Sequence, residues 1–214
     1  MKRLLMALVG AFTLLGAPGA FAQISDIDGR WSFGGGFTSF SLTGLDAPQM
    51  KDLGFESSIP GFYFGASLDY AFSAIEGLNV EPGVYITHYG KPFKFGLAEN
   101  HKSYHANYIY IPINLKYSIP LAGDAFGMAL YTGPRFNLGM GGNMFSTGKT
   151  YPAIRPYEAQ WGFGIGFMIQ DAILIRGGYD LGVTNCLKTN KDLNFEDKVA
   201  RRNALYVGAS FLFR

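Results

Sequence analysis

The sequence predicts an all-β fold, a single eight-stranded antiparallel up-and-down transmembrane β-barrel. Residues 202–213 alternate apolar with small or polar side chains almost to the end of the chain. The same alternation recurs in seven further segments, and the connections between segments alternate between long and short. A period of two indicates β-strands, because successive Cβ atoms point to opposite faces of a sheet.

The first 22 residues have the features of a secretory signal. They contain a positively charged start, a short apolar run and an A-F-A cleavage site before Gln23. The apolar run is too short to cross a bilayer as a helix. We therefore expect a cleaved signal peptide over residues 1–22 and one outer-membrane β-barrel domain over residues 23–214. Such a protein would be exported through the periplasm to the outer membrane of a Gram-negative bacterium.

The composition fits a membrane barrel and excludes a nucleic-acid-binding surface. The chain has 18 Lys+Arg and 16 Asp+Glu, and removal of Lys2 and Arg3 leaves 16 of each sign. A nucleic-acid-binding protein would show a basic excess. Aromatic residues make up 16% of the chain and charged residues only 16%, which suits a barrel in lipid better than a soluble domain. Cys186 is the only cysteine, so we expect a loop thiol that is solvated or partly buried, not a nucleophile.

Eight segments show the alternation and are long enough to cross a bilayer when tilted. They are residues 30–41, 60–72, 78–89, 104–119, 125–138, 157–170, 172–184 and 202–213. The clearest is 104–119, where Ile, Leu and Tyr occupy the odd positions from 109 to 119 and the even positions include Pro112, Asn114 and Lys116. An amphipathic helix would instead repeat at three and four residues.

The connections alternate as they do in small outer-membrane barrels, which have short periplasmic turns and long external loops. The expected external loops are 41–59, 90–103, 139–155 and 185–201, and the expected turns are 73–77, 120–124 and a tight turn near 170–171. With eight strands, both ends of the barrel domain lie on the periplasmic side.

Most of the strand charges fall on the inward row. They are Arg30, Asp69, Glu81, Lys116, Arg135, Arg176 and Asp180. An eight-stranded barrel is only wide enough to be filled by side chains, and buried charges must be paired. We therefore expect the three acids to face the four bases in a structural salt-bridge network that closes the lumen, and we prefer this to a narrow ion path. Inward glycines would make room for bulky lumen residues such as Tyr85 and Tyr131.

The catalytic inventory is weak. The chain has no G-x-S-x-G, H-E-x-x-H or P-loop motif. His88, His101 and His105 fall near the external rim, and Ser103 and Glu99 are close in sequence, but nothing fixes the geometry that a His-based triad needs. We expect no enzymatic activity, no cofactor and no metal site. A lipid-modifying barrel enzyme and a narrow channel remain the alternatives.

The expected partners follow from the fold and the loops. They are outer-membrane lipid and lipopolysaccharide, the barrel-assembly machinery during biogenesis, and a protein partner through the external loops, with no nucleic acid. The loops mix lysines with aromatic residues, as at Lys91, Phe93 and Lys149. An aromatic girdle with solvated lysines, which every such barrel needs, explains this mixture, and contact with lipopolysaccharide phosphates is the alternative.

Several motifs in the C-terminal half carry a family resemblance. Residues 108–117 (Y-I-Y-I-P-I-N-L-K-Y) resemble the Y-I-x-I-P-x-x-L-K-Y strand of the PorT-like outer-membrane β-barrel family of Bacteroidetes-type bacteria. Residues 130–134 resemble its next strand, 176–185 its R-x-x-Y-D-x-G-x-T-N strand, and 205–208 its closing strand. The family usually ends on an aromatic residue, whereas this chain adds Arg214.

The resemblance implies an eight-stranded barrel in the outer membrane. Most members of the family lack a known biochemical activity, and its name comes from a member linked to protein secretion. In this resemblance Pro112 marks a local break in strand pairing, and Arg176 and Asp180 belong to the lumen network. No motif residue has an evident catalytic role.

Overall fold

The computed structural model describes the strands of the protein and the residues next to them. The described residues are 29–44, 58–72, 75–90, 106–122, 125–140, 155–186 and 199–213. The predicted signal peptide and most of the four predicted external loops lie outside these ranges. Within them, no helix is long and apolar enough to cross a membrane.

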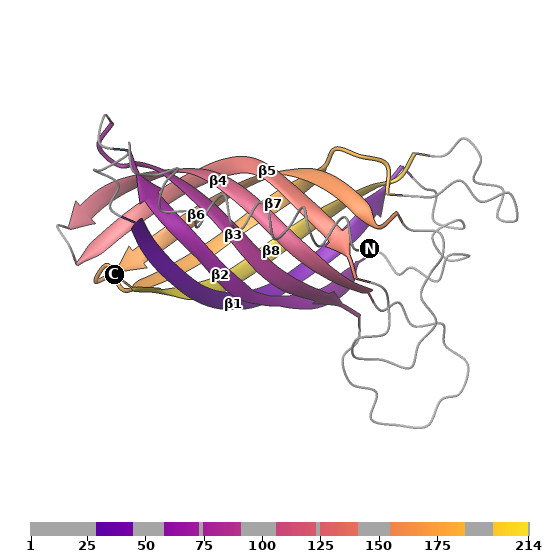
Figure 1. The fold of residues 1–214 in the computed structure, drawn as a ribbon, viewed down its shortest axis with the longest axis horizontal. Helices are drawn as coiled ribbons and strands as arrows, with labels where there is room; N and C mark the ends of the chain where they lie inside the picture. Colours follow the sequence, from indigo (N-terminus) through magenta and orange to yellow (C-terminus); the bar gives the residue numbers. More distant parts are fainter. Residues whose placement is uncertain are drawn as a thin grey trace, which may run out of the picture.

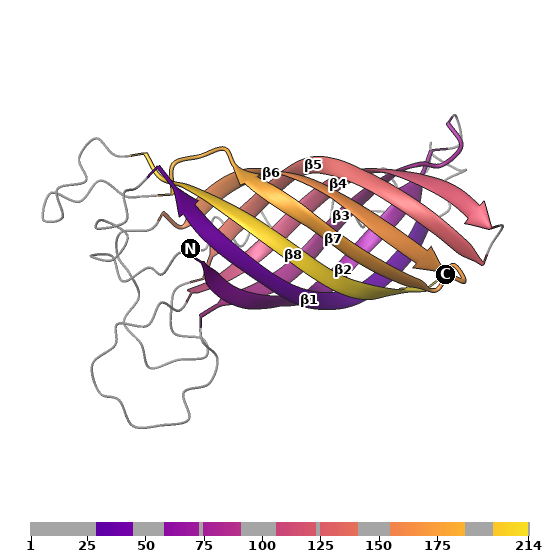
Figure 2. The same ribbon diagram turned by 180° about the vertical axis from the view of Figure 1, so that it is seen from behind.

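Eight strands form one closed barrel in which each strand pairs with its neighbours in sequence (Figure 1). The strands are β1 (Gly29–Thr43), β2 (Ile59–Ala71), β3 (Leu78–Tyr89), β4 (Ala106–Ala122), β5 (Phe126–Gly139), β6 (Tyr157–Ile169), β7 (Ile173–Gly182) and β8 (Arg201–Phe213). Figure 2 shows β8 beside β1, the antiparallel pairing that closes the barrel. The predicted eight-stranded antiparallel barrel is therefore confirmed.

The strand bounds agree with the expected ones to within three residues. The largest difference is in β4, which was expected to end at residue 119 but continues to Ala122. Pro120 pairs with Gly127, and the register shifts between Pro120 and Ala122. Such a β-bulge lets a strand continue past a proline, which cannot donate to the ladder.

The pairing register fixes the width of the barrel. A path through paired residues runs from Gly29 through Tyr70, Val80, Leu115, Thr132, Phe163, Tyr179 and Leu205 to Ser39. It therefore returns to β1 ten residues further along. With about 3.3 Å per residue and about 4.8 Å between strands, this stagger tilts the strands by roughly 41° and gives a barrel radius of about 8 Å.

The two faces of each strand differ as expected. In β6 the odd positions from Tyr157 to Ile169 are exposed except Ala159, which is half-buried, whereas Glu158, Gln160 and Gly162 are buried. The other strands follow the same alternation over most of their length, and their outward residues are predominantly apolar. With the strands tilted in this way, their outward apolar rows span roughly 25 Å along the barrel axis. This is the height of the lipid-facing band of such barrels.

Proline interrupts the pairing of β3 with β4, as the sequence indicated. Paired residues continue from Leu78 to Pro82 and resume at Tyr85, on either side of the stretch that faces Pro112. Because Pro112 has no N–H group, it cannot complete the ladder there.

The position of the apolar outward band predicts how the cost of an outward arginine depends on its depth in the membrane. Ala209 is exposed at the middle of the outward apolar row of β8, which runs from Leu205 to Phe213, whereas outward Ser39 follows the last apolar outward residue of β1, Phe37, toward the long connections. Ala209→Arg should lower the free energy of unfolding in lipid vesicles by about 2–4 kcal/mol, and Ser39→Arg by about 1 kcal/mol or less. Urea titration of both variants measures this difference, and equal losses would contradict the placement of the band.

Candidate functional site

The inward rows bring charged side chains to three levels of the lumen. The inner cluster, nearer the short turns, comprises Asp69, Glu81, Lys116 and Arg176. The middle pair is Arg135 with Asp180. The outer pair, nearer the long connections, is Glu158 with Arg202. These three groups hold four bases and four acids, so their formal charges cancel.

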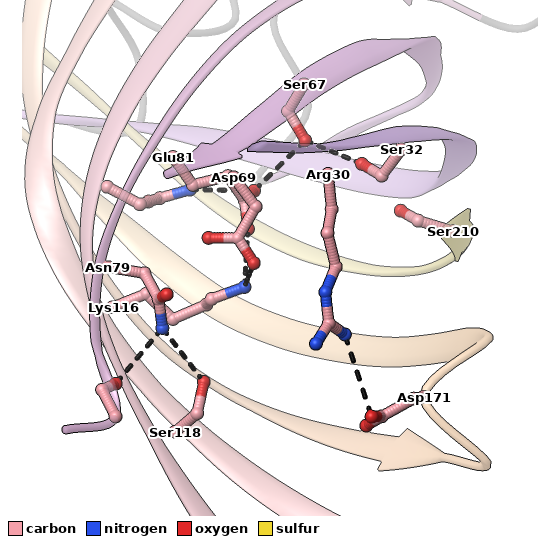
Figure 3. Close-up of polar contacts among 12 residues, drawn as sticks. Arg30, Ser32, Ser67, Asp69, Asn79, Glu81, Lys116, Ser118, Asp171 and Ser210 are labelled. Carbon is pink, nitrogen blue, oxygen red and sulfur yellow. Dashed lines mark hydrogen bonds and ion pairs between the residues drawn. The ribbon is translucent and has the colours of Figure 1, made fainter. Parts of the chain in front are cut away.

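Glu81 lies at the centre of the inner cluster. Arg176 Nη1 donates a hydrogen bond of 2.6 Å to Glu81 Oε1, and Lys116 Nζ lies 3.4 Å from Glu81 Oε2. Lys116 also forms an ion pair with Asp69 (Figure 3). The register explains this meeting, because β3 lies between β2 and β4 in the barrel. Arg176 reaches the same carboxylate from β7, on the opposite wall of the lumen.

Neutral side chains complete the hydrogen bonds of the inner cluster. Ser67 Oγ donates to Glu81 Oε1 at 3.2 Å, and Asn114 Nδ2 donates to the same oxygen at 3.3 Å. Ser32 Oγ is hydrogen-bonded to Ser67 Oγ at 2.7 Å. A buried carboxylate with these partners is compensated for the water it has lost.

The middle pair is packed against glycine and tyrosine. Arg135 Nε lies 3.4 Å from Asp180 Oδ1, and Tyr110 Oη donates to Asp180 Oδ2 at 3.0 Å. A Cβ atom added to Gly162 would lie 2.5 Å from both Arg135 Nε and Asp180 Oδ1. Only glycine therefore leaves room for this pair beside β6.

The outer pair combines an ion pair with aromatic rings. Arg202 Nε lies 2.7 Å from Glu158 Oε2, and both side chains are 2% exposed. The Arg202 guanidinium carbon lies 4.2 Å from the centre of the Tyr108 ring, 5.2 Å from that of Tyr89 and 5.5 Å from that of Phe40. These distances are within the range of cation–π attraction.

Sequence reasoning missed the outer pair. Both residues occupy the second position of their strands, next to the predicted loops. The alternation could have identified both residues as inward, because residues two positions apart share a face of a strand. Glu158 is two positions before inward Gln160, and Arg202 is two positions before inward Ala204. The seven predicted lumen charges included neither residue, so the predicted set was incomplete at the long-connection end.

Arg30 differs from the other six predicted lumen residues. It faces Asp69 in the strand register, but its guanidinium extends to Asp171 in the β6–β7 turn, with 3.7 Å between Nη1 and Oδ2 (Figure 3). The two side chains are 24% and 39% exposed. Arg30 therefore forms a partly solvated pair at the mouth of the barrel. Its expected partners were Asp69, Glu81 and Asp180, and Asp171 was not among them.

Aromatic side chains fill most of the remaining lumen. A Cβ atom on Gly164 would overlap the Tyr131 ring, whose hydroxyl donates to Gly177 O at 2.9 Å. Tyr85 approaches Gly65 in the same way, with 2.9 Å between the added Cβ atom and Tyr85 Cδ1. One cavity among these side chains has a volume of about 30 Å³. At about 10–15 Å³ per water, it holds roughly two water molecules.

The other candidate residues lie outside the lumen. His88 Nδ1 is 2.7 Å from Asn107 Oδ1, on the outward face of β3 and β4 near the long connections. His101, His105, Ser103 and Glu99 lie outside the described residues. Over the described ranges, no three His, Cys, Asp or Glu side chains gather as metal ligands would.

Cys186 lies just beyond β7 and is 1% exposed. Its backbone N–H donates to Ala200 O, and its carbonyl accepts from the Arg155 N–H, both at 2.8 Å. Burial raises the pKa of the Cys186 thiol to about 12, with a further contribution from the Glu158 carboxylate. The thiol is more deeply buried than the sequence suggested, and the raised pKa disfavours a nucleophilic role.

Loss of one charge from the inner cluster should be costly. Glu81→Gln would leave Lys116 and Arg176 buried with one carboxylate, Asp69, between them, and should lower the free energy of unfolding by about 3–5 kcal/mol. Arg30→Gln removes a partly exposed pair and should cost less than about 1 kcal/mol. Urea unfolding in lipid vesicles, followed by tryptophan fluorescence, compares the two. Similar losses would show that the inner cluster is no more important to stability than the mouth.

The Cys186 thiol should resist modification in the folded protein. A pKa near 12 in place of about 9 leaves roughly a thousandfold less thiolate at pH 8, so alkylation by iodoacetamide should be slow until the protein is unfolded. The raised pKa also means that the thiol favours folding below about pH 9 and that this contribution is lost as the pH rises toward 12. Cys186→Ala should lack that part of the pH dependence. Equal alkylation rates before and after unfolding would refute the burial.

Three solved barrels are similar to this chain in structure. Ail of Yersinia pestis, in complex with the heparin analogue sucrose octasulfate, is 14% identical over 87% of this chain and 99% of its own, with a TM-score of 0.43. Neisserial surface protein A is 14% identical over 88% of this chain and 100% of its own, with a TM-score of 0.42. The N-terminal β-barrel domain of Pseudomonas aeruginosa OprF is 13% identical over 87% and 100%, with a TM-score of 0.39. Curated proteins gave no significant match.

A protein-family comparison covers most of the sequence. The family described as outer membrane protein beta-barrel domain matches residues 21–188, which is more than half of the chain. The match extends from before β1 to beyond β7, so it includes the strands that supply all but one of the lumen charges described above. The chain therefore belongs to the outer membrane protein beta-barrel domain family and is an integral protein of the Gram-negative outer membrane.

Proposed function

We propose that this protein is a non-enzymatic outer-membrane barrel with a closed lumen, which acts through its external loops in envelope integrity, secretion support or surface binding. The supporting observation is the lumen itself. Four buried or nearly buried bases meet four such acids, and the cavity above the inner cluster measures only about 30 Å³. In a barrel with such a lumen, the surfaces available for binding are the outer wall and the external loops.

The balance of charges favours closure over conduction. An ion path needs a continuous column of water, whereas here Glu81 is bonded to Lys116 on the adjacent strand β4 and to Arg176 on β7, on the opposite wall. To pass, an ion would have to separate these partners, and breaking a buried pair costs several kcal/mol. The narrow channel is therefore the less favoured alternative.

The long-connection end supplies polar groups at the level expected for lipid headgroups. Arg201 is exposed on the outward face of β8, beyond the apolar row that begins at Leu205, and Arg155 is exposed just before β6. Cations at this level suit the phosphates of lipopolysaccharide. We propose lipopolysaccharide as the lipid partner, the external loops as the site of a protein partner, and the barrel-assembly machinery as the partner in biogenesis.

Within its family, we propose that the chain is PorT-like. The support is the set of motifs at 108–117, 130–134, 176–185 and 205–208. Arg176 and Asp180 of the third motif contribute to the inner cluster and the middle pair. These ion pairs support a structural role for the two motif residues, and the accessory role in secretion rests on the motif resemblance alone.

One observation favours a second candidate function. His88 Nδ1 lies 2.7 Å from Asn107 Oδ1, and an amide oxygen orients an imidazole as it would in a general base. This pair is at the level of the outer-leaflet headgroups, which is where a lipid-modifying enzyme would act. Mass spectra of lipid A from cells with and without the protein distinguish this candidate, and unchanged spectra would exclude it.

Planar-bilayer recording of the refolded protein tests the closed lumen. The wild type should show no discrete conductance steps, because the inner cluster blocks the path. Glu81→Ala and Arg176→Ala remove its central bond and should introduce steps or unstable leaks. Arg30→Ala, at the solvated mouth, is the matched control and should remain silent. Reproducible wild-type steps that change in the Glu81 and Arg176 variants would make the channel the leading function.

A further inference from the structure

A small chamber lies in the lumen above the inner cluster. Its walls include the side chains of Tyr63, Tyr85, Tyr110 and Tyr206, and Thr87 also lines it. Tyr63 stands edge-on to Tyr85 and Tyr206, with ring centres 5.7 Å and 6.1 Å apart. At about 30 Å³, the chamber has room for roughly two waters between these hydroxyl-bearing rings.

The chamber is also lined by polar atoms that need a partner. Asn114 Oδ1 and Arg176 Nε are buried and have no hydrogen bond to any residue that the structure describes. Both residues line the chamber and are more than nine-tenths buried. Buried water in proteins typically satisfies groups of this kind, so the chamber is suited to hold water or a small polar solute.

The floor of the chamber is fixed from several strands. Glu81 on β3 receives hydrogen bonds from Ser67 on β2, Asn114 on β4 and Arg176 on β7. Arg176 Nη2 donates a further bond of 3.4 Å to Ser210 Oγ on β8. To open this floor, bonds to four other strands would have to break together.

The roof of the chamber is attached in a different way. Above it lies the outer pair, with the rings of Phe40, Tyr89 and Tyr108 around the Arg202 guanidinium. Arg202 Nε lies 2.7 Å from Glu158 Oε2, so an ion pair and the three rings, and not a network of hydroxyl and amide groups like that around Glu81, close this level of the lumen. Both residues are second in their strands, and backbone hydrogen bonds join Arg155 and Ala200, just beyond them, to Cys186. An outward movement at the strand ends that breaks these two bonds would carry the outer pair toward the external end of the barrel.

We propose that the outer pair and its three rings form a gate, through which water and small polar solutes enter the chamber from the external side while the inner cluster stays closed. The chamber is then a dead-end pocket facing outward and not a segment of a channel. Burial of the Arg202 and Glu158 charges in low dielectric costs free energy. In the open state hydration of the two charges offsets this cost, and in the closed state the ion pair and the ring contacts offset it. This balance makes the roof, and not the floor, the element that opens.

Thiol labelling from solution tests the gate. The reporter is Thr87→Cys, which places a thiol in the chamber, in a Cys186→Ala background. The reagent is methyl methanethiosulfonate, which is small and uncharged, and intact mass gives the labelling rate in lipid vesicles. With the outer pair intact the rate should be slow, and Arg202→Ala should raise it roughly tenfold or more, because the ion pair and its ring contacts are both lost.

Two further variants keep the test decisive. Glu158→Gln preserves the shape of the side chain and removes its charge, so it should also accelerate labelling, and it serves if Arg202→Ala fails to fold. Ser210→Cys places the thiol in the floor and should label at the same slow rate with or without Arg202. Equal acceleration at both positions would indicate general loosening and overturn the gate, as would fast labelling of Thr87→Cys with the outer pair intact. This experiment measures labelling and not conductance. It can therefore refute the gate while the proposal of a closed inner cluster stands, and the conductance experiment can do the reverse.

Discussion

Closure of the sheet with a stagger of ten residues is the constraint on which the rest of the structure depends. Eight strands with this stagger enclose a cylinder about 8 Å in radius, which side chains must fill because a lumen this narrow holds little water. Inward side chains can then meet across the lumen, as Arg176 on β7 meets Glu81 on β3. Glycines such as Gly162 and Gly164 are needed where Arg135 and Tyr131 cross the lumen.

The same constraint decides how the charges are arranged. In a narrow cylinder with low dielectric, a charge is tolerated only beside its opposite, and the four bases and four acids meet that condition at three levels. The levels are not equivalent. The inner cluster links five strands by hydrogen bonds and ion pairs through Glu81 and Arg176, whereas the outer pair joins β6 to β8 by an ion pair and meets β1, β3 and β4 through aromatic rings.

If the inner cluster closes the lumen, as we propose, the function of the protein lies on the outside of the barrel. The apolar outward rows of the barrel face lipid, and polar side chains such as Arg201 and the His88–Asn107 pair follow at the external rim. A role in the envelope would therefore depend on the rim and the loops, with the lumen providing a stable base. Cys186, held by backbone bonds to Arg155 and Ala200, connects the segments that leave β7 and enter β6 and β8.

The sequence by itself determined the strands, the direction of each side chain and the alternation of turns and loops, because a period of two is a local property of an extended chain. It placed Glu81, Lys116, Asp69 and Arg176 inside, and the structure brings them together. It could not pair them, since which inward charges meet depends on the stagger between strands far apart in sequence. Arg30 shows this, because it turns to Asp171 instead of its neighbour Asp69. The outer pair with its ring cage and the chamber beneath it were likewise decided only by tertiary structure, because they require side chains of several strands to occupy the same level of a closed cylinder.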